Sequence, residues 1–202
     1  MLYFLSFATA FLIGAFPTGY LLARIVKKID IREYGSGNVG ATNVSRTLGK
    51  GPGIFVLAVD FAKGLLPVII FSKLFFHNAD NQWIAAWIGF AAVIGHVYNP
   101  FLGFKGGKGV ATGAGAVCAV NPGIFLMAIL MWLVIFAITK IVSISSLGSS
   151  IAMVISCLFY PMDLKVRIFF ALMCLLAFWT HRSNISRLLK GEEQPLVKRP
   201  NK

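Results

Sequence analysis

The chain has 202 residues, of which 57% are hydrophobic and only 13% charged, and its mean hydropathy is +0.79. Soluble domains carry about twice this share of charge, so the composition excludes a soluble protein as well as a disordered chain, a coiled coil and a disulfide scaffold. The net charge of +12 would indicate nucleic acid in a soluble protein; in a polytopic membrane protein it indicates basic cytoplasmic loops beside anionic headgroups, and no nucleic-acid partner.

The first apolar run covers residues 2–23, with no basic residue before it. A cleavable signal peptide begins with basic residues, whereas here Arg24, Lys27 and Lys28 follow the run. This order predicts a retained first span with its N-terminus outside, kinked where Pro17 and Gly19 interrupt the helix.

The later apolar runs cover 54–76, 83–102, 110–142, 144–160 and 166–180. The linker from His77 to Gln82 has no Lys or Arg, and Asn121-Pro122-Gly123 places a turn signal inside 110–142. The last 22 residues form a polar, basic tail. The cysteines lie in apolar runs without metal-ligand spacing, so we expect them to be buried thiols: Cys118, Cys157 and Cys174.

The distribution of basic residues predicts the number of crossings. Residues 24–50 and 182–202 carry six Lys or Arg each, which places both segments in the cytoplasm and excludes six spans. Seven short spans fit, and so do five if 110–142 crosses once and 144–160 does not cross. Because the Asn-Pro-Gly break suits a continuous span poorly, we predict an all-α bundle of seven transmembrane helices, with five as the alternative. Residues 1–202 then form one membrane domain with a cytoplasmic C-terminus.

The first polar segment runs from Tyr34 to Arg46 and contains Gly35-x-Gly37-x-x-Gly40. This spacing formally matches a dinucleotide-binding fingerprint, but a membrane span precedes it where the fingerprint needs a strand and a βαβ unit. The glycines would let backbone N–H groups approach an anion, and Arg46 would add a bidentate cation. Neutral donors accompany them: Ser36, Asn38, Thr42 and Asn43. The alternative is a flexible loop with helix caps.

The second polar segment, 95–112, contains Lys105-Gly106-Gly107-Lys108-Gly109 ahead of a new apolar helix. It fails the P-loop pattern because Gly109 stands where Ser or Thr should follow the lysine. It still predicts a phosphate nest at a helix N-terminus, while Gly109 and Gly113 could serve helix packing instead. His96, near a span end, suits a structural hydrogen bond as well as catalysis.

Two further features carry charge. Residues 181–193 are predicted to extend the last span as a helix, with His181, Asn184 and Leu188 on one face; the alternative is a basic helix lying on the headgroups. Asp60 and Lys63 stand three residues apart within a span, where unpaired charges are costly, so we predict that they pair and brace the loops.

The predicted topology places all three polar segments on the cytoplasmic side. The segments that begin at Tyr34 and Gly95 contain no acidic residue. Among the cations that the three segments offer are Arg46, Lys105, Lys108, Arg182 and Arg187. This combination favours an anionic, phosphate-bearing substrate at the membrane surface.

The three segments closely resemble the signature motifs of the acyl-phosphate:glycerol-3-phosphate acyltransferase family (PlsY). The residues that carry the resemblance are Gly-Ser-Gly-Asn-Val-Gly-Ala-Thr-Asn at 35–43, Gly-His-x-Tyr at 95–98 with Phe-Lys-Gly-Gly-Lys-Gly-Val-Ala-Thr at 104–112, and His-Arg-x-Asn-Ile-x-Arg-Leu at 181–188. The resemblance extends over the whole chain. It implies a bacterial inner-membrane enzyme that performs the first acylation step of phospholipid synthesis at the cytoplasmic face.

The reaction implied is transfer of a fatty acyl group from acyl phosphate to the sn-1 hydroxyl of glycerol 3-phosphate, giving lysophosphatidate and phosphate. The resemblance also implies membrane-lipid contacts and a functional link to a soluble enzyme that makes acyl phosphate, with no cofactor and no metal. It favours a substrate phosphate over a histidine as the proton acceptor. The rival functions are a phosphate-ester transporter, which the lack of repeated halves disfavours, and a lipid-binding scaffold.

The resemblance carries roles over by position to Ser36, Arg46, the loop 106–109 with Lys108, His181, Asn184 and an acid of the third motif, and the chemistry of the three segments adds the other residues. The expected catalytic residues are Ser36, Arg46, His96, Lys108, His181 and Asn184. The expected substrate-binding residues are Gly35, Gly37, Asn38, Gly40, Thr42, Asn43, Lys105, Gly106, Gly107, Gly109, Thr112 and Arg182. Structural support is expected from Asp60, Lys63 and an acid of the third motif, Glu192 or its neighbour Glu193, of which we take Glu192.

Overall fold

The computed structural model describes residues 2–75 and 82–196, and within these ranges the regular structure is entirely helical. Most of the predicted linker 77–82 and the end of the tail, 197–202, lie outside the described residues. The elements are α1 (Leu2–Gly14), α2 (Thr18–Lys27), η1 (Ile31–Glu33), α3 (Ala41–Leu48), α4 (Lys50–Phe75), α5 (Gln82–Val97), η3 (Pro100–Leu102), α6 (Val110–Val120), α7 (Pro122–Thr139), α8 (Val142–Ser156), α9 (Leu164–Thr180) and α10 (Arg182–Leu189). The all-α prediction is confirmed.

Four segments of the described chain are long and apolar enough to cross a membrane: Leu2–Lys27, Lys50–Leu74, Gln82–Leu102 and Pro122–Thr139. A fifth is added if α9 and α10, bent by 58°, are taken together. The apolar helices α6 and α8 are shorter, and about 20 residues are needed to span the hydrocarbon core of a bilayer. The membrane class predicted from composition agrees with these spans, and the count of seven stays a prediction.

The helices break where the sequence supplies breaking residues. The first apolar run divides at Ala15–Pro17 into α1 and α2, near the predicted kink. The stretch 110–142 divides at Asn121, whose side chain accepts a hydrogen bond from the Ile124 N–H (3.0 Å) and so caps α7. The third motif was expected to extend the last span as a helix. It forms a separate helix, because the chain bends at His181 before α10 begins.

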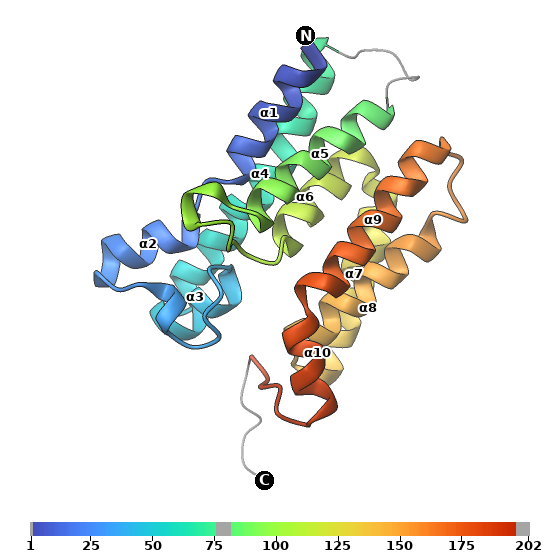
Figure 1. Cartoon of the computed structure of the whole chain (residues 1–202). Helices are drawn as coiled ribbons and strands as arrows, with labels where there is room; N and C mark the ends of the chain where they lie inside the picture. The colour runs from blue at the N-terminus through green and yellow to red at the C-terminus, as the bar shows by residue number, and fades with distance from the viewer. Residues whose placement is uncertain (1, 76–81, 197–202) are drawn as a thin grey trace.

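The chain runs back and forth between two ends of the molecule, with Leu2 at one end and α2, α3 and α10 at the other (Figure 1). Helix α1 packs on α5, α4 on α6, and α8 on α7 and α9. The polar segments 34–46 and 181–193 therefore lie at the same end of the bundle, as the topology prediction required.

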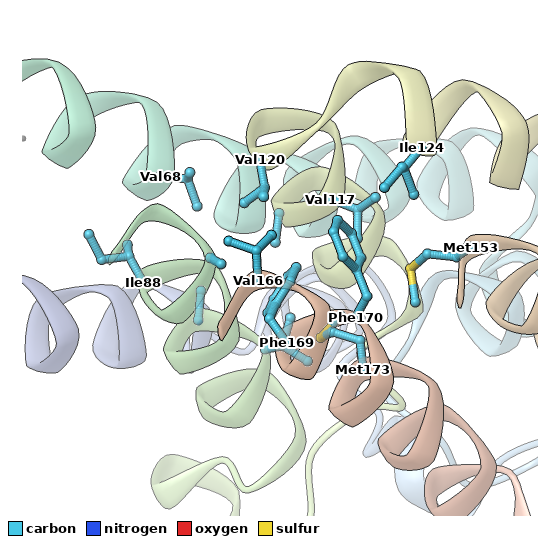
Figure 2. Close-up of a cluster of buried hydrophobic side chains, with 14 of the residues drawn as sticks. Val68, Ile88, Val117, Val120, Ile124, Met153, Val166, Phe169, Phe170 and Met173 are labelled. Atoms are coloured by element: carbon cyan, nitrogen blue, oxygen red, sulfur yellow. The ribbon is translucent and has the colours of Figure 1, made fainter. Parts of the chain in front are cut away.

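The larger apolar core brings side chains of α9 together with those of α4 to α8 (Figure 2). The phenyl rings of Phe169 and Phe170 are fully buried there, with ring centroids 5.0 Å apart in an edge-on arrangement. They pack among aliphatic side chains of α4 to α8: Val68, Ile88, Val117, Val120, Ile124 and Met153. This packing joins the helices of the first half of the chain to those of the second.

Candidate functional site

The loop before α3 is organised by the side chain of Asn43, which is 1% exposed. Its amide nitrogen donates to the carbonyls of Tyr34 and Asn38 (2.9 Å each) and of Ile31 (3.3 Å), and its oxygen accepts from the Ser36 N–H (2.9 Å). These bonds occupy the whole amide. Asn43 therefore shapes the loop, and its expected contact with substrate stays a prediction.

Two glycines of this loop have backbone conformations that favour glycine. Gly35 and Gly37 have φ values of +59° and +71°. A Cβ on Gly35 would also lie 2.2 Å from the Asn43 side-chain oxygen. Asn38 accepts a hydrogen bond from the Gly40 N–H (2.9 Å), closing an Asx turn. The predicted binding glycines and Asn38 thus set the path of the loop that displays the exposed Ser36.

Arg46 projects from α3 and is exposed. Its guanidinium donates to the Gln194 carbonyl (3.0 Å), so the segment after α10 reaches across to α3. The same segment is fixed at Leu196, whose N–H donates to the Lys140 carbonyl (2.9 Å). These contacts bring the first and third motifs together at one end of the bundle (Figure 1).

The glycine loop between η3 and α6 packs tightly on the end of α5. The Gly106 N–H donates to the Val97 carbonyl (3.0 Å) and the Gly107 N–H to the His96 carbonyl (3.2 Å). Both amides are therefore used within the protein, and the expectation that the loop forms a phosphate nest stays a prediction. Gly109, at φ +79°, caps α6. The loop's contribution to a site is to place the Lys108 side chain.

A polar network connects this lysine to the third motif. The Lys108 ammonium donates to the Asn184 side-chain oxygen, and the Asn184 nitrogen donates to Glu193 (2.5 Å). Glu193 also accepts from the Ser143 hydroxyl (2.8 Å) and the Arg187 guanidinium (2.7 Å). The network thus joins α6's entry loop, the start of α8, and α10.

The charges of the network affect one another. Burial lowers the pKa of Lys108 to about 8; the nearby Glu193 carboxylate opposes this shift, and Arg187 and Arg46 add to it. Burial raises the pKa of Glu193, but the hydrogen bonds from Asn184, Ser143 and Arg187 outweigh burial and bring that pKa below its usual value. Glu193 is therefore an ionised anchor with its acceptors occupied, whereas Lys108 has no salt bridge among the described residues.

His181 lies at the bend between α9 and α10 and is 2% exposed. Its Nδ1 lies 2.7 Å from the Ala177 carbonyl oxygen. Because a carbonyl can only accept, Nδ1 carries the hydrogen, and Nε2 is an acceptor in the neutral ring. Of the three residues predicted to share one helix face, His181 and Asn184 are buried and Leu188 is half-buried.

Asp60 and Lys63 pair as predicted, with the ammonium 2.7 Å from the Asp60 Oδ1 atom and both side chains buried in α4. Lys63 also donates to the Phe16 carbonyl (2.7 Å), and Asn99 donates to the Ala15 carbonyl (2.5 Å). These side chains thus satisfy carbonyls exposed by the break between α1 and α2. His96 lines a small pocket together with this pair.

Three predicted site residues lie elsewhere. Thr112 is fully buried in α6, against Gly64 of α4, and its hydroxyl has no partner among the described residues. Arg182 is exposed and stacks over the Trp179 ring (4.8 Å to the centroid), on the outside of the bundle. Glu192 is exposed, and the acid within the network is Glu193, so Glu192 was the wrong choice between two neighbours.

The remaining predicted residues differ in how much the structure says of them. Lys105 is exposed on the glycine loop, and Thr42 is half-buried near the start of α3.

Ser143 is a member of the polar network around Glu193 that sequence reasoning missed. The sequence signal was a serine-rich start to an apolar helix. Its neighbour Ser145 bonds only to its own helix and Ser146 to its own helix and to Trp132 of α7, so that signal does not single out Ser143.

Comparison with known proteins agrees with this arrangement. Residues 4–191 match the family described as glycerol-3-phosphate acyltransferase. The chain belongs to this family. A relative from Macrococcus caseolyticus, named glycerol-3-phosphate acyltransferase, is 44% identical over 91% of this chain and 92% of its own length.

Two solved structures share the family fold. The glycerol 3-phosphate form of PlsY (YgiH), an integral membrane glycerol 3-phosphate acyltransferase, has a TM-score of 0.89 at 39% identity and covers 96% of this chain and 94% of its own. Its lysophosphatidic acid form has a TM-score of 0.86 at 38% identity, with the same coverage. The family resemblance inferred from the three motifs is confirmed, and the fold is that of an integral membrane protein.

Proposed function

We propose that this protein transfers a fatty acyl group from acyl phosphate to the sn-1 hydroxyl of glycerol 3-phosphate, releasing lysophosphatidate and inorganic phosphate. The observation that carries the proposal is the contact between Lys108 and Asn184, which joins the glycine loop to the third motif beside Arg46. Family membership and the ligand forms of the related PlsY structures support the same substrate class.

The chemistry needs charge neutralisation more than a strong base. Acyl phosphate is a mixed anhydride with a good leaving group, so the main barrier is holding two phosphates of like charge beside one hydroxyl. Lys108 and Arg46 would neutralise these phosphates, and a cation in a partly buried site does so strongly. Holding the reactants in register supplies much of the remaining rate enhancement.

The other residues would orient the reactants. Ser36 would hold the donor phosphate, while Asn184, fixed by Glu193, would keep Lys108 in position and face the incoming hydroxyl. The hydroxyl oxygen attacks the acyl carbon, the bond from that carbon to the phosphate oxygen breaks, and the hydroxyl proton passes to a phosphate oxygen. His181, with Nδ1–H bound to Ala177, would accept a hydrogen bond from the hydroxyl through Nε2.

The setting proposed for this reaction is the cytoplasmic face of the bacterial inner membrane. One domain, 1–202, would cross seven times through α1, α4, α5, α6, α7, α8 and α9, starting outside. The positions of Leu2 and α10 at opposite ends of the bundle support an odd count. The acyl chain would enter between helices from the lipid, and a soluble enzyme would supply acyl phosphate.

The test uses purified protein in detergent with glycerol 3-phosphate and either acyl phosphate or acyl-CoA, measuring phosphate and lysophosphatidate. We expect turnover with acyl phosphate alone and a loss of about a hundredfold or more in kcat/KM for Lys108→Met. Lys50→Met, an exposed lysine at the start of α4, is the matched control and should retain full activity. Turnover with acyl-CoA only would refute the proposed donor.

A further inference from the structure

The imidazole of His96 lies directly beneath the glycine loop that carries Lys108. A Cβ built on Gly107 would lie 2.2 Å from His96 Nε2 and 3.0 Å from the neighbouring ring carbon Cε1. Hydrogen bonds from Gly106 and Gly107 to the last turn of α5 hold the loop against this ring. The backbone hydrogen bonds and the His96 ring together set how closely the loop approaches α5.

The His96 ring lies among other buried polar residues. His96 is buried, and it shares a small pocket with Asp60, Lys63 and Asn99. Lys63 is fixed by its ion pair with Asp60, and both Lys63 and Asn99 are hydrogen-bonded to carbonyls at the break between α1 and α2. His96 thus lies between the glycine loop and a pocket lined by buried polar residues near the break between α1 and α2.

We propose that His96 is a positioning residue: its ring supports Gly107 and so fixes the reach of Lys108 toward Asn184. The residue immediately after Gly107 carries the ammonium that meets Asn184, so a displacement of the loop is passed directly to that contact. His96 would then act through Lys108, with no proton transfer of its own. For its kinetic readouts this inference rests on the proposed acyl transfer.

Alanine substitutions at two adjacent glycines separate support by the ring from other roles. Gly107→Ala would drive a methyl group into the His96 ring, and φ at Gly107 lies outside the left-handed region, so the overlap is the main obstacle. We expect KM for glycerol 3-phosphate to rise about ten- to hundredfold, because misplacing a positioning group by about 1 Å has effects of that size. Adding His96→Ala should recover most of the loss by removing the ring.

Gly106→Ala is the matched control. Its Cβ would lie 1.9 Å from the His96 backbone carbonyl oxygen, which no change of side chain can remove. The pair Gly106→Ala with His96→Ala should therefore bind glycerol 3-phosphate no better than Gly106→Ala alone. Recovery at neither glycine, or equal recovery at both, would overturn the proposal.

The single variant His96→Ala separates positioning from catalysis. We expect a several-fold rise in KM, a kcat within about tenfold of the wild type, and an unchanged shape of the pH–rate profile. A fall of about 10⁴ in kcat at constant KM, with loss of one limb of that profile, would make His96 a general base and overturn the proposal. His96→Asn, which also withdraws from position 107, replaces His96→Ala in every comparison if that variant does not fold.

A binding readout keeps this inference separate from the proposed function. The rise in Tm that glycerol 3-phosphate produces in detergent measures ligand binding without turnover. A wild-type protein that shows this rise but no acyl transfer would refute the proposed reaction, while the recovery specific to Gly107 could still be read in the Tm values. A wild type that transfers acyl groups without that recovery would refute only the role of His96.

Discussion

Lys63, which is buried, and Lys108, which is half-buried, have different roles in this molecule although the side chain is the same. Lys63, inside α4, is neutralised by Asp60 and bonded to the Phe16 carbonyl, so its charge is balanced within the fold. Lys108 contacts the neutral Asn184, and the nearest carboxylate, Glu193, is already held by three other groups.

The difference in pairing between Lys63 and Lys108 indicates where a ligand would bind. A buried cation is normally paired within the protein, and Lys63 meets that condition whereas Lys108 does not among the described residues. A phosphate would complete the pairing at Lys108 without breaking the anchor at Glu193. Lys108 thus carries a positive charge that a bound phosphate can pair with, whereas Asp60 and Lys63 inside α4 pair with each other and support the fold.

Lys63→Met should have the largest effect, and that effect should fall on stability. It would leave Asp60 as an unpaired buried charge and remove one of the two donors to the Phe16 carbonyl, which keeps the Thr18 N–H. Breaking a buried ion pair in this way costs about 3–5 kcal/mol. The measurement is Tm in detergent, with Lys73→Met, an exposed lysine of the same helix, as the matched control. Asp60→Asn combined with Lys63→Met should recover part of the loss. A Tm equal to that of the wild type for Lys63→Met would contradict the assigned role.

Glu193→Gln should have an intermediate effect on both stability and activity. The amide lacks one of the two acceptor atoms that Ser143, Asn184 and Arg187 share, so Asn184 would lose its fixed orientation toward Lys108. We expect kcat/KM to fall about tenfold, the size of one charged hydrogen bond. Glu192→Gln, one residue earlier and exposed, should behave as the wild type. Equal losses in the two variants would show that Glu193 does not anchor Asn184.

The choice between Glu192 and Glu193 shows where sequence reasoning ends. Composition and the spacing of apolar runs predict the helices, and Asn121-Pro122 predicts the break before α7, because these are local properties of the chain. Adjacent acids have the same composition and charge. Which one faces Ser143, some 50 residues away, depends on the turn after α10 and on the packing of α8 against α9.

The same limit explains the glycine loop. The sequence predicts that Gly106 and Gly107 allow a close approach, and in the structure their backbone lies close to the end of α5, a partner that the sequence does not reveal. The sequence also could not reveal that the Asn43 side chain bonds to four backbone groups, because buried and exposed asparagines cannot be told apart in a sequence. The pairing of Asp60 with Lys63 was predictable because both lie on one helix, three residues apart.

The smallest predicted effect is a pH dependence of substrate binding at Lys108. With a pKa lowered to about 8 in the free protein, Lys108 is charged below pH 8 and becomes neutral above it. Glycerol 3-phosphate stays ionised over this range, since the second pKa of a phosphate monoester is about 6. Affinity should therefore be constant from pH 6.5 to about 7.5 and should weaken by up to about tenfold per pH unit above 8.

The measurement is the dissociation constant of glycerol 3-phosphate at each pH, obtained from ligand-dependent Tm shifts without an acyl donor. Lys108→Arg is the control, because a guanidinium stays protonated throughout the range. That variant should bind more weakly than the wild type at neutral pH, since its planar head does not fit the contact with Asn184, but its affinity should not change between pH 7 and 9.5. Wild-type affinity that is equally flat would mean that the Lys108 charge does not hold the phosphate, and the difference drawn between the two lysines would then fail.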